Sequence, residues 1–458
     1  MTQAKSQFKE QGGIATMDPS AFRRWVISKL MSMLASEKRM QSKRKKAEKQ
    51  RLKTGQPHVV EYFHQVDDAY SLLTAQVLKL LLTRYNIELR CHLVTGPTGH
   101  NVAEPELLLN LGLTDAKSIA EHYGLTFPKR DTLPSSKKCH LAQSILAKQD
   151  PATFLDSLAG VSEAFWQQGD TTLDDLANHL GCANAQDTED KITQGNKRRA
   201  ALKHYSGAMF YYGGEWYWGV DRLYHLEKRL KELGADCTPD DALLMPRPNT
   251  ELPNLKDDGT LTLEIYASLR SPYTAIVFDR AVQLTKDTGV KCVVRPVLPM
   301  VMRGVPATKE KGFYILFDTA REARAAGVPY GNVCDPIGQP ARHGYALYQW
   351  ACKLNKGTAF LSHFLQAAFA DGVNTNKQKG LRQVVEKTGL DWHQAKRHLS
   401  NPSWEQTLEV NRLAMYQSGL WGVPSFRVLN RQGEETLAVW GQDRLWLVAH
   451  EINRLIAG

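Results

Sequence analysis

The sequence lacks any closely spaced pair of cysteines. No two of its seven cysteines form the Cys-x-x-Cys pair that a redox dithiol or half of a zinc site uses. An odd, unclustered set argues against a disulfide framework and is typical of structural thiols in a reducing compartment. No group of His, Cys and carboxylate residues has metal-ligand spacing, so we expect no metal site. The seven are Cys91, Cys139, Cys182, Cys237, Cys292, Cys334 and Cys352.

Long hydrophobic runs are also lacking. The longest, Leu78–Leu82, is interrupted by Lys79, whereas a membrane-spanning helix needs about 20 apolar residues. The amino-terminal MTQAKSQFKEQGG has no apolar region behind its basic residues and does not resemble a secretory signal. We therefore expect no membrane span and a cytoplasmic location. A length of 458 residues exceeds what one core usually organises and predicts two domains.

Acidic residues are scarce at the amino terminus. Residues 1–55 carry fourteen Lys/Arg and four Asp/Glu, which accounts for the whole net charge of +10. The dense run KRKKAEKQRLK at 43–53 could contact nucleic acid or an anionic membrane, although a solvated helix is the favoured interpretation. Before it, Asp18 or Ser20 could cap an amphipathic helix. Its apolar stripe would contain Phe22, Trp25, Val26 and Leu30.

Two segments near the starts of two predicted domains repeat at a constant offset of 203. VVEYFHQVDDAYSLL from Val59 aligns with TLEIYASLRSPYTAI from Thr262, which places Tyr70 on Tyr273. In each copy a short β-rich run leads through a turn into a helical pattern. This is the opening β-α of an α/β domain.

The carboxyl ends of the two copies repeat as well. WGVDRL at 218–223 matches WGQDRL at 440–445, and each begins a final helix. Between the ends, the pattern is a crossover, a helical insertion and a hairpin. The predicted fold is therefore α/β, with two thioredoxin-like domains, each with a helical insertion, plus a basic N-terminal helix. The predicted boundaries are 1–55 for the basic extension, 56–233 for the first domain, 234–259 for a linker rich in Pro and Asp, and 260–458 for the second domain.

The second copy carries a set of motifs in a recognisable order. The motifs are Ser271-Pro272-Tyr273, Arg295-Pro296-Val297-Leu298, Lys311-Gly312-Phe313-Tyr314 with Asp318 and Arg321, Asn411, Gly422-Val423-Pro424-Ser425-Phe426, and Trp440-Gly441-Gln442-Asp443-Arg444-Leu445. With these motifs, the segment of roughly 261–458 resembles the DsbA-like thioredoxin superfamily, in the branch that contains 2-hydroxychromene-2-carboxylate isomerase and kappa-class glutathione transferase.

Ser271 is the predicted catalytic residue. Serine at N-cap and Pro272 at the first helical position are good helix-start residues, and a helix amino terminus stabilises an anion. In DsbA-like oxidoreductases cysteines occupy the positions of Ser271 and Thr274, so exchange by this chain's own thiols is not expected. The resemblance implies glutathione as the cofactor, with Ser271 hydrogen-bonded to its sulfur.

Further glutathione-binding residues are implied by the resemblance. Val423 and Pro424 are expected to form a cis peptide that presents backbone to a peptide-like ligand, the alternative being a plain turn proline. Gln442 and Asp443 are expected at the γ-glutamyl end of the ligand, and Lys311 is the remaining binding residue. Capping of the last helix is the alternative for Asp443, with Arg444 then at the surface.

Several positions depart from the pattern of the family. Ser268 stands where an acidic residue is usual, and Val305 replaces a polar Asn before Pro306. In the first copy Asp68 replaces Ser271, Ala69 replaces Pro272, and Met209 falls at the place of Pro424. An anionic side chain would repel a thiolate, so 56–233 is interpreted as a non-catalytic partner domain. Its Asp221-Arg222 pair is explained by helix capping.

The resulting functional prediction is a glutathione-dependent isomerase or transferase that acts on a small hydrophobic electrophile. Tyr273, Trp421 and Phe426 would line the hydrophobic side of the site or belong to the core. A non-catalytic scaffold is the alternative, and nucleic-acid binding by the basic tail alone is a third, less favoured class. The sequence leaves the substrate and the oligomeric state open, a homo-oligomer included.

Overall fold

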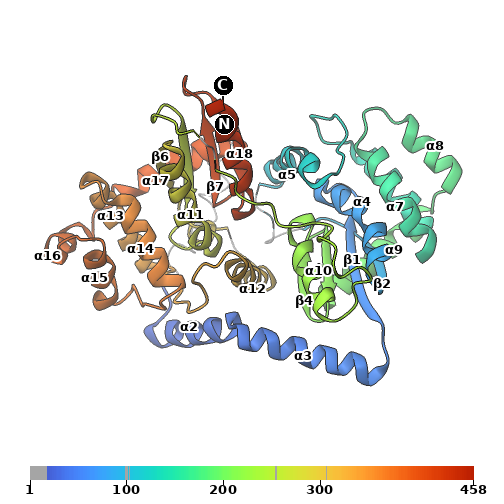
Figure 1. Cartoon of the computed structure of the whole chain (residues 1–458), viewed down its shortest axis with the longest axis horizontal. Helices are drawn as coiled ribbons and strands as arrows, with labels where there is room; N and C mark the ends of the chain where they lie inside the picture. Colours follow the sequence, from blue (N-terminus) through green and yellow to red (C-terminus); the bar gives the residue numbers. More distant parts are fainter. Residues whose placement is uncertain (1–17, 98–101, 103, 253–254, 306, 458) are drawn as a thin grey trace. The chain divides into compact units, whose positions relative to one another are not determined.

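The computed structural model describes residues 18–457 except 98–101, 103, 253–254 and 306 (Figure 1). The chain divides into two compact units, which we call the first unit and the second unit. The first unit comprises Gln41–Pro248. The second unit comprises Asn249 onward together with the described residues up to Met40. None of the helices in the described part of the chain is long and apolar enough to cross a membrane.

The first unit is built on a four-stranded sheet of order β2-β1-β3-β4. β1 pairs in parallel with β2 and antiparallel with β3, which pairs antiparallel with β4. Its strands are β1 (His58–Gln65), β2 (Ile87–Val94), β3 (Met209–Tyr212) and β4 (Glu215–Trp218). Its helices are α4 (Ala69–Arg84), α5 (Pro105–Ala120), α6 (Ser136–Lys148), α7 (Pro151–Trp166), α8 (Thr171–Leu180), α9 (Ala185–Ala201) and α10 (Leu223–Glu232), preceded by most of α3 (Glu37–Thr54).

The second unit repeats this plan with a sheet of order β6-β5-β7-β8. Its strands are β5 (Thr262–Ala267), β6 (Lys291–Pro296), β7 (Ser425–Leu429) and β8 (Glu435–Trp440). Its helices are α2 (Ala21–Ala35), α11 (Pro272–Thr288), α12 (Lys309–Ala325), α13 (Gln339–Lys353), α14 (Gly357–Phe369), α15 (Gln378–Lys387), α16 (Trp392–Ala395), α17 (Trp404–Gln417) and α18 (Leu445–Ala457). Helices α11 and α18 pack against each other and against the sheet.

The two sheets have the same register in their parallel halves. Tyr62 lies opposite Cys91 in the first unit, and Ile265 lies opposite Val294 in the second, so both partners are shifted by the predicted offset of 203. In each unit helices are inserted between the second and third strands. The predicted fold class is confirmed: two thioredoxin-like α/β domains, each with a helical insertion, and a basic N-terminal helix.

The pairing of the antiparallel strands shows that one predicted correspondence between residues of the two units is wrong. Met209 pairs with Phe63, whose counterpart Tyr266 pairs with Ser425, so Met209 corresponds to Ser425 and not to Pro424. Ala208 holds the place of Pro424. Its carbonyl oxygen accepts a hydrogen bond from Gly219 N at 2.7 Å, as that of Pro424 accepts from Gly441 N at 2.9 Å.

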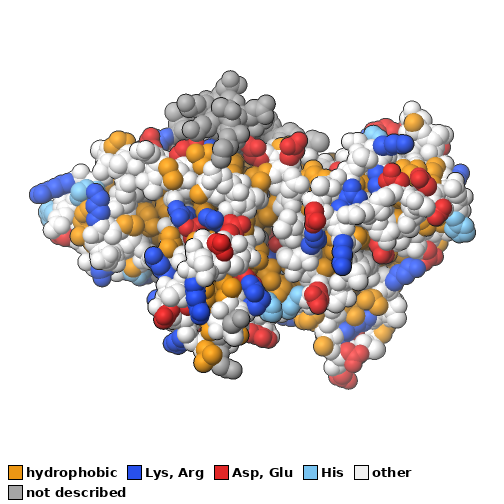
Figure 2. Space-filling view, turned by 90° about the horizontal axis from the view of Figure 1, so that it is seen from above, with side chains coloured by type: hydrophobic (Ala, Val, Ile, Leu, Met, Phe, Trp, Pro, Cys, Tyr) orange, Lys and Arg blue, Asp and Glu red, His pale blue; other side chains and the backbone are white. Residues whose placement is uncertain are grey.

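The amino-terminal helices are divided between the units. α2 begins after its N-cap Ser20, which accepts a hydrogen bond from Arg23 N, and it packs against α12. Most of α3, which has no buried residue, belongs to the first unit. The predicted extension 1–55 and linker 234–259 are thus each shared between the units, and residues 1–17 lie outside the described residues. On the visible face of Figure 2, Lys/Arg and Asp/Glu side chains are interspersed.

Candidate functional site

Ser271 is the N-cap of α11, at the carboxyl end of β5. Its Oγ accepts a hydrogen bond from Thr274 N at 3.1 Å and lies 3.4 Å from the carbonyl oxygen of Val423, to which it donates. Pro272 occupies the first helical turn. The Ser271 side chain is partly exposed. A hydroxyl, a helix amino terminus and the loop before β7 therefore meet at one accessible point.

The Val423–Pro424 bond is the only cis peptide among the described residues, as the sequence predicts. The bonds before Ala208 and before Met209 in the first unit are both trans. Ala208 instead has a φ of +51°. The first unit therefore lacks both the serine and the cis proline of the second.

Tyr273 connects α11 to α12 through a buried carboxylate. Its hydroxyl donates to Asp318 Oδ2 at 2.8 Å, and Arg321 pairs with Asp318 Oδ1 at 2.7 Å. These three motif residues therefore position the two helices beside the site. Tyr273 remains partly exposed, which is consistent with a place on the hydrophobic side of the site.

Lys311, near the start of α12, lies over the indole of Trp421. The distance from Nζ to the ring centroid is 5.0 Å, and burial lowers the pKa of the ammonium group to about 8. Trp421 is buried and also contacts Trp440 edge to face at 5.4 Å. Phe426 is fully buried in the sheet. Of the two interpretations open for Trp421 and Phe426, core packing is the one that the structure favours.

Gln442 and Asp443 lie in a single 3-10 turn, Gln442–Arg444, that packs against α11. The buried Gln442 donates from Nε2 to Glu322 Oε2 at 2.8 Å and also to Asp443 Oδ1. Its buried Oε1 has no hydrogen-bond partner in the structure. Asp443 is partly exposed, whereas Arg444 is buried. The surface position of Arg444 that belonged to the alternative interpretation, capping by Asp443, is therefore not observed, because the turn folds that side chain inward.

Two residues outside the sequence motifs also hold the site in place. Glu322, one turn beyond Asp318 on α12, is buried and holds Gln442. Tyr345 on α13 accepts a hydrogen bond from Leu269 N at 3.2 Å and donates to Val297 O at 2.9 Å, which fixes the turn before Ser271. Both contacts join elements distant in sequence, so no local pattern indicates them.

The corresponding positions of the first unit are differently arranged. Asp68 caps α4 by accepting hydrogen bonds from Tyr70 N at 3.3 Å and Ser71 Oγ at 3.0 Å. Burial raises the pKa of this carboxyl to about 7. Asp221, the counterpart of Asp443, accepts a hydrogen bond from Tyr123 in the inserted segment at 3.0 Å. In the first unit, neighbouring polar groups thus hold both carboxylates, and the hydroxyl that Ser271 supplies in the second unit is replaced by one of them.

Other candidate chemistry is absent from the described residues. All seven cysteines are free, and burial raises the pKa of Cys91 and of Cys139 to about 12. No group of three or more His, Cys, Asp or Glu residues in the described chain could hold a metal ion. An open depression of about 380 Å³ in the first unit contains none of the predicted site residues. It is lined by Thr126, Phe127, Pro128, Lys129, Glu163, Gln167 and Gln168.

Residues 262–453 match the DSBA-like thioredoxin domain. This part of the second unit is called the DSBA-like domain below. No curated protein sequence matches the chain.

Solved structures resemble the chain over less than half of its length. A 2-hydroxychromene-2-carboxylate isomerase is 20% identical, with 42% of this chain and 95% of that one covered and a TM-score of 0.36. A probable DsbA oxidoreductase from Streptomyces coelicolor is 18% identical, with 43% and 89% covered and a TM-score of 0.35. The cytosolic disulfide reductase DsbM from Pseudomonas aeruginosa is 19% identical, with 42% and 97% covered and a TM-score of 0.28.

Proposed function

We propose that the DSBA-like domain is a glutathione-dependent isomerase or transferase that uses the bound thiol on a hydrophobic electrophile. The observation that carries the proposal is the position of Ser271. Its hydroxyl caps α11 and lies 3.4 Å from the carbonyl oxygen of the residue before the cis proline. That bond is at the long end of hydrogen-bond distances, so the hydroxyl can turn to an incoming sulfur at little cost.

A thiolate placed beside Ser271 would be stabilised in two ways. The first turn of α11 offers backbone N–H groups and the positive end of the helix dipole. A hydrogen bond from the serine hydroxyl to a charged sulfur is stronger than one to a neutral thiol, which lowers the thiol pKa. Ser271 would thus increase the fraction of the reactive thiolate near neutral pH.

The remaining residues supply contacts for the peptide part of the ligand. The backbone beside the cis peptide at Val423 suits a peptide-like chain, which can pair with main-chain groups. The partly exposed carboxylate of Asp443 is an acceptor for the ammonium group of a γ-glutamyl residue, and the buried Gln442 orients that carboxylate by donating to it from Nε2. Lys311 offers a cation for a carboxylate of the ligand or the substrate.

The proposed chemistry needs no further reactant. The thiolate sulfur adds to an electrophilic carbon conjugated to a carbonyl, and the electron pair of the double bond moves to the carbonyl oxygen. Rotation about the resulting single bond, followed by loss of the same sulfur, returns an isomer and the free thiolate. Where the enolate instead takes up a proton from solvent at carbon, the carbon–sulfur bond is kept, one glutathione leaves with the product, and the outcome is conjugation.

A scaffold role is proposed for the first unit. We infer that both units derive from duplication of one domain, because strand order and register are the same in both. In the first unit a carboxylate replaces the serine, and Tyr123 engages Asp221. These differences favour a non-catalytic partner domain.

Calorimetric titration of the full chain with glutathione tests the proposal. We expect binding by the parent and weaker binding by Ser271→Ala. Ser135→Ala is the matched control, since Ser135 is an exposed N-cap serine that accepts a hydrogen bond from Lys138 N at 3.2 Å in the first unit. S-methylglutathione, which cannot ionise at sulfur, should bind parent and Ser271→Ala equally. Absence of glutathione binding by the parent would favour the scaffold role for both units.

A further inference from the structure

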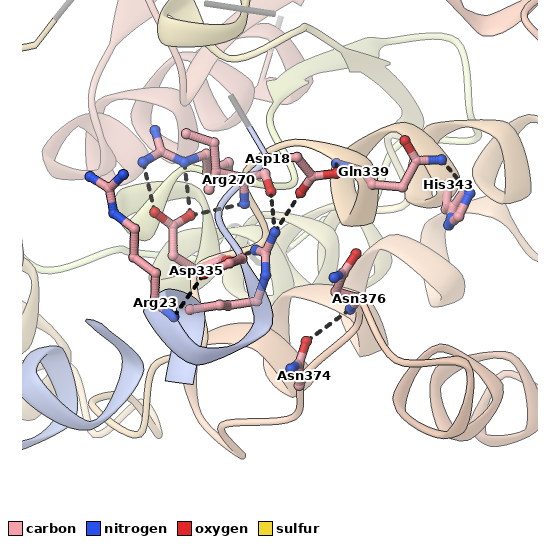
Figure 3. A network of polar contacts seen from close by, with 11 residues as sticks. Asp18, Arg23, Arg270, Asp335, Gln339, His343, Asn374 and Asn376 are labelled. Carbon is pink, nitrogen blue, oxygen red and sulfur yellow. Dashed lines mark hydrogen bonds and ion pairs between the residues drawn. The ribbon is translucent and has the colours of Figure 1, made fainter. Parts of the chain in front are cut away.

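Helix α2 is attached to the second unit by its polar face. Arg24, which is buried, donates to the carbonyl oxygens of Asp335 at 2.8 Å and Ile337 at 3.0 Å (Figure 3). Ser28 Oγ donates to Val333 O at 2.5 Å. One turn further along, Ser32 Oγ accepts a hydrogen bond from Val333 N at 2.9 Å. Backbone groups of the loop before α13 therefore hydrogen-bond to polar side chains of α2 and hold that side of the helix against the second unit.

Another side of α2 is largely apolar and exposed to solvent. Its five large side chains lie three or four residues from one another along this side of the helix, with the exposed Lys29 among them. The exposed fractions are 75% for Phe22, 58% for Trp25, 40% for Val26, 43% for Leu30 and 47% for Met33. An amphipathic helix on a protein normally buries such a stripe, and contiguous exposed apolar patches mark interaction sites.

The charges on α2 itself are of one sign, and those of the next helix are mostly of the same sign. α2 contains no Asp or Glu, and its Arg23 and Lys29 are exposed. Immediately after it, α3 carries nine Lys/Arg and two Glu, and none of its residues is buried. Exposed lysines of α3 include Lys38, Lys45, Lys46, Lys49 and Lys53.

We propose that the exposed face of α2 docks on an anionic lipid surface, with the helix lying in the interface. Trp and Phe on an apolar stripe, on a helix that carries basic residues and no acidic ones, is the combination that interfacial helices use. Basic side chains match the negative charge of anionic headgroups. A nucleic acid would use the lysines but not the stripe. The fifteen residues of α2 are too few to cross the bilayer.

Flotation of the full-length protein with lipid vesicles tests the proposal. The probes are vesicles of phosphatidylcholine alone and of phosphatidylcholine mixed with phosphatidylglycerol. We expect binding to the mixed vesicles, weakened by salt, and little binding to the neutral ones. Phe22→Gln with Trp25→Gln should reduce binding to the mixed vesicles by about tenfold or more, because both side chains then lose their transfer into the interface.

A matched variant distinguishes vesicle binding by the stripe of α2 from binding by exposed apolar side chains elsewhere on the protein. Val410→Gln removes a side chain of α17 that is 55% exposed, and it should bind vesicles like the parent. Since Phe22 and Trp25 are exposed, their replacement should leave the circular dichroism of the protein unchanged. Hydrogen exchange in α2 should slow when mixed vesicles are added.

Two results would overturn the lipid assignment. One is equal flotation of the parent and the Phe22→Gln, Trp25→Gln variant. The other is a parent that does not float but sediments as a dimer, with the variant as a monomer, since the stripe would then bind a second copy of the chain. These outcomes do not depend on glutathione, so the proposal stands or fails separately from that for Ser271.

Discussion

The hydroxyl of Tyr273 donates a hydrogen bond to Asp318 at 2.8 Å, and the hydroxyl of Tyr70 donates to Asp115 at 2.7 Å. Tyr273 lies 203 positions after Tyr70, and Asp318 lies 203 positions after Asp115. Each pair joins the helix after the first strand to the first long helix of the insertion. The bond is thus a structural element that both units keep, although only the second unit keeps the proposed thiol site.

Removing the hydroxyl group should destabilise each unit by a similar amount. We expect Tyr273→Phe and Tyr70→Phe each to cost about 1–3 kcal/mol, because each leaves a buried aspartate with one partner fewer. Hydrogen exchange followed separately in α12 and α5 measures this without assuming that the two units unfold together. A loss in only one unit would contradict the equivalence of the two bonds.

Asp68 should make the stability of the first unit depend on pH. Its pKa is about 7 in the folded chain and about 4 when unfolded, so between these values the folded state binds more protons. Stability contributed by this group therefore falls as the pH rises from about 4 to about 7, and is constant above. Asp68→Asn keeps an N-cap residue and should be more stable than the parent at pH 8, by on the order of 2 kcal/mol, but not at pH 4.

Denaturant unfolding at both pH values measures this difference, with hydrogen exchange in α4 as a local readout. Asp391→Asn is the control, because Asp391 is an exposed N-cap aspartate in the second unit that accepts a hydrogen bond from Gln394 N. A stabilisation by Asp68→Asn that is equal at pH 4 and pH 8 would exclude titration of Asp68 as its cause.

Lys311 should give ligand binding an upper pH limit. Burial lowers its pKa to about 8, so the cation is present below this pH and is lost as the pH rises through it. With S-methylglutathione, whose sulfur does not titrate, affinity for the parent should fall above about pH 8. Lys311→Met should bind more weakly at pH 7 and lose affinity less steeply, because only the ammonium group of the ligand then titrates. Calorimetry across this range compares the two proteins, and an equal fall in parent and variant would remove Lys311 from the site.

The sequence predicted those features that depend on local pattern or on the repeat. The offset of 203 places β1 on β5 and Tyr70 on Tyr273, and the register of the parallel strands agrees. The alignment of the hairpins was wrong by one residue at Met209, because strand pairing sets register and loop lengths differ between the copies. Burial of Arg444 was missed for a similar reason, since it depends on a turn packing against α11.

The orientation of α2 shows a second limit of sequence patterns. Its periodicity gives the helix and its stripe, including Phe22 and Trp25, but periodicity alone does not say which face is covered. Hydrogen-bond donors on Arg24 and Ser28 meet backbone carbonyls more than 300 residues away in sequence. Such contacts are visible only once the chain is folded.

Ser271→Ala should raise the pKa of glutathione's thiol in the complex. The substitution removes one hydrogen bond to the charged sulfur, while the amino terminus of α11 remains. A hydrogen bond to a charged group contributes about 1.5–3 kcal/mol, which corresponds to a rise of about 1–2 pKa units. Losing the N-cap costs the fold about 0.5–2 kcal/mol, an amount that a domain of this size tolerates.

The thiolate absorbance of bound glutathione, recorded against pH at saturating ligand, measures this pKa directly. Ser135→Ala loses an equivalent N-cap in the first unit and should titrate like the parent. Asp68→Ala tests the first unit at the position of Ser271 itself and should also leave the curve unchanged. A parent and Ser271→Ala with the same titration curve would leave Ser271 as a helix cap. Because the comparison reads the ionisation of the sulfur and not turnover, loss of the rest of the active site could not imitate the expected shift.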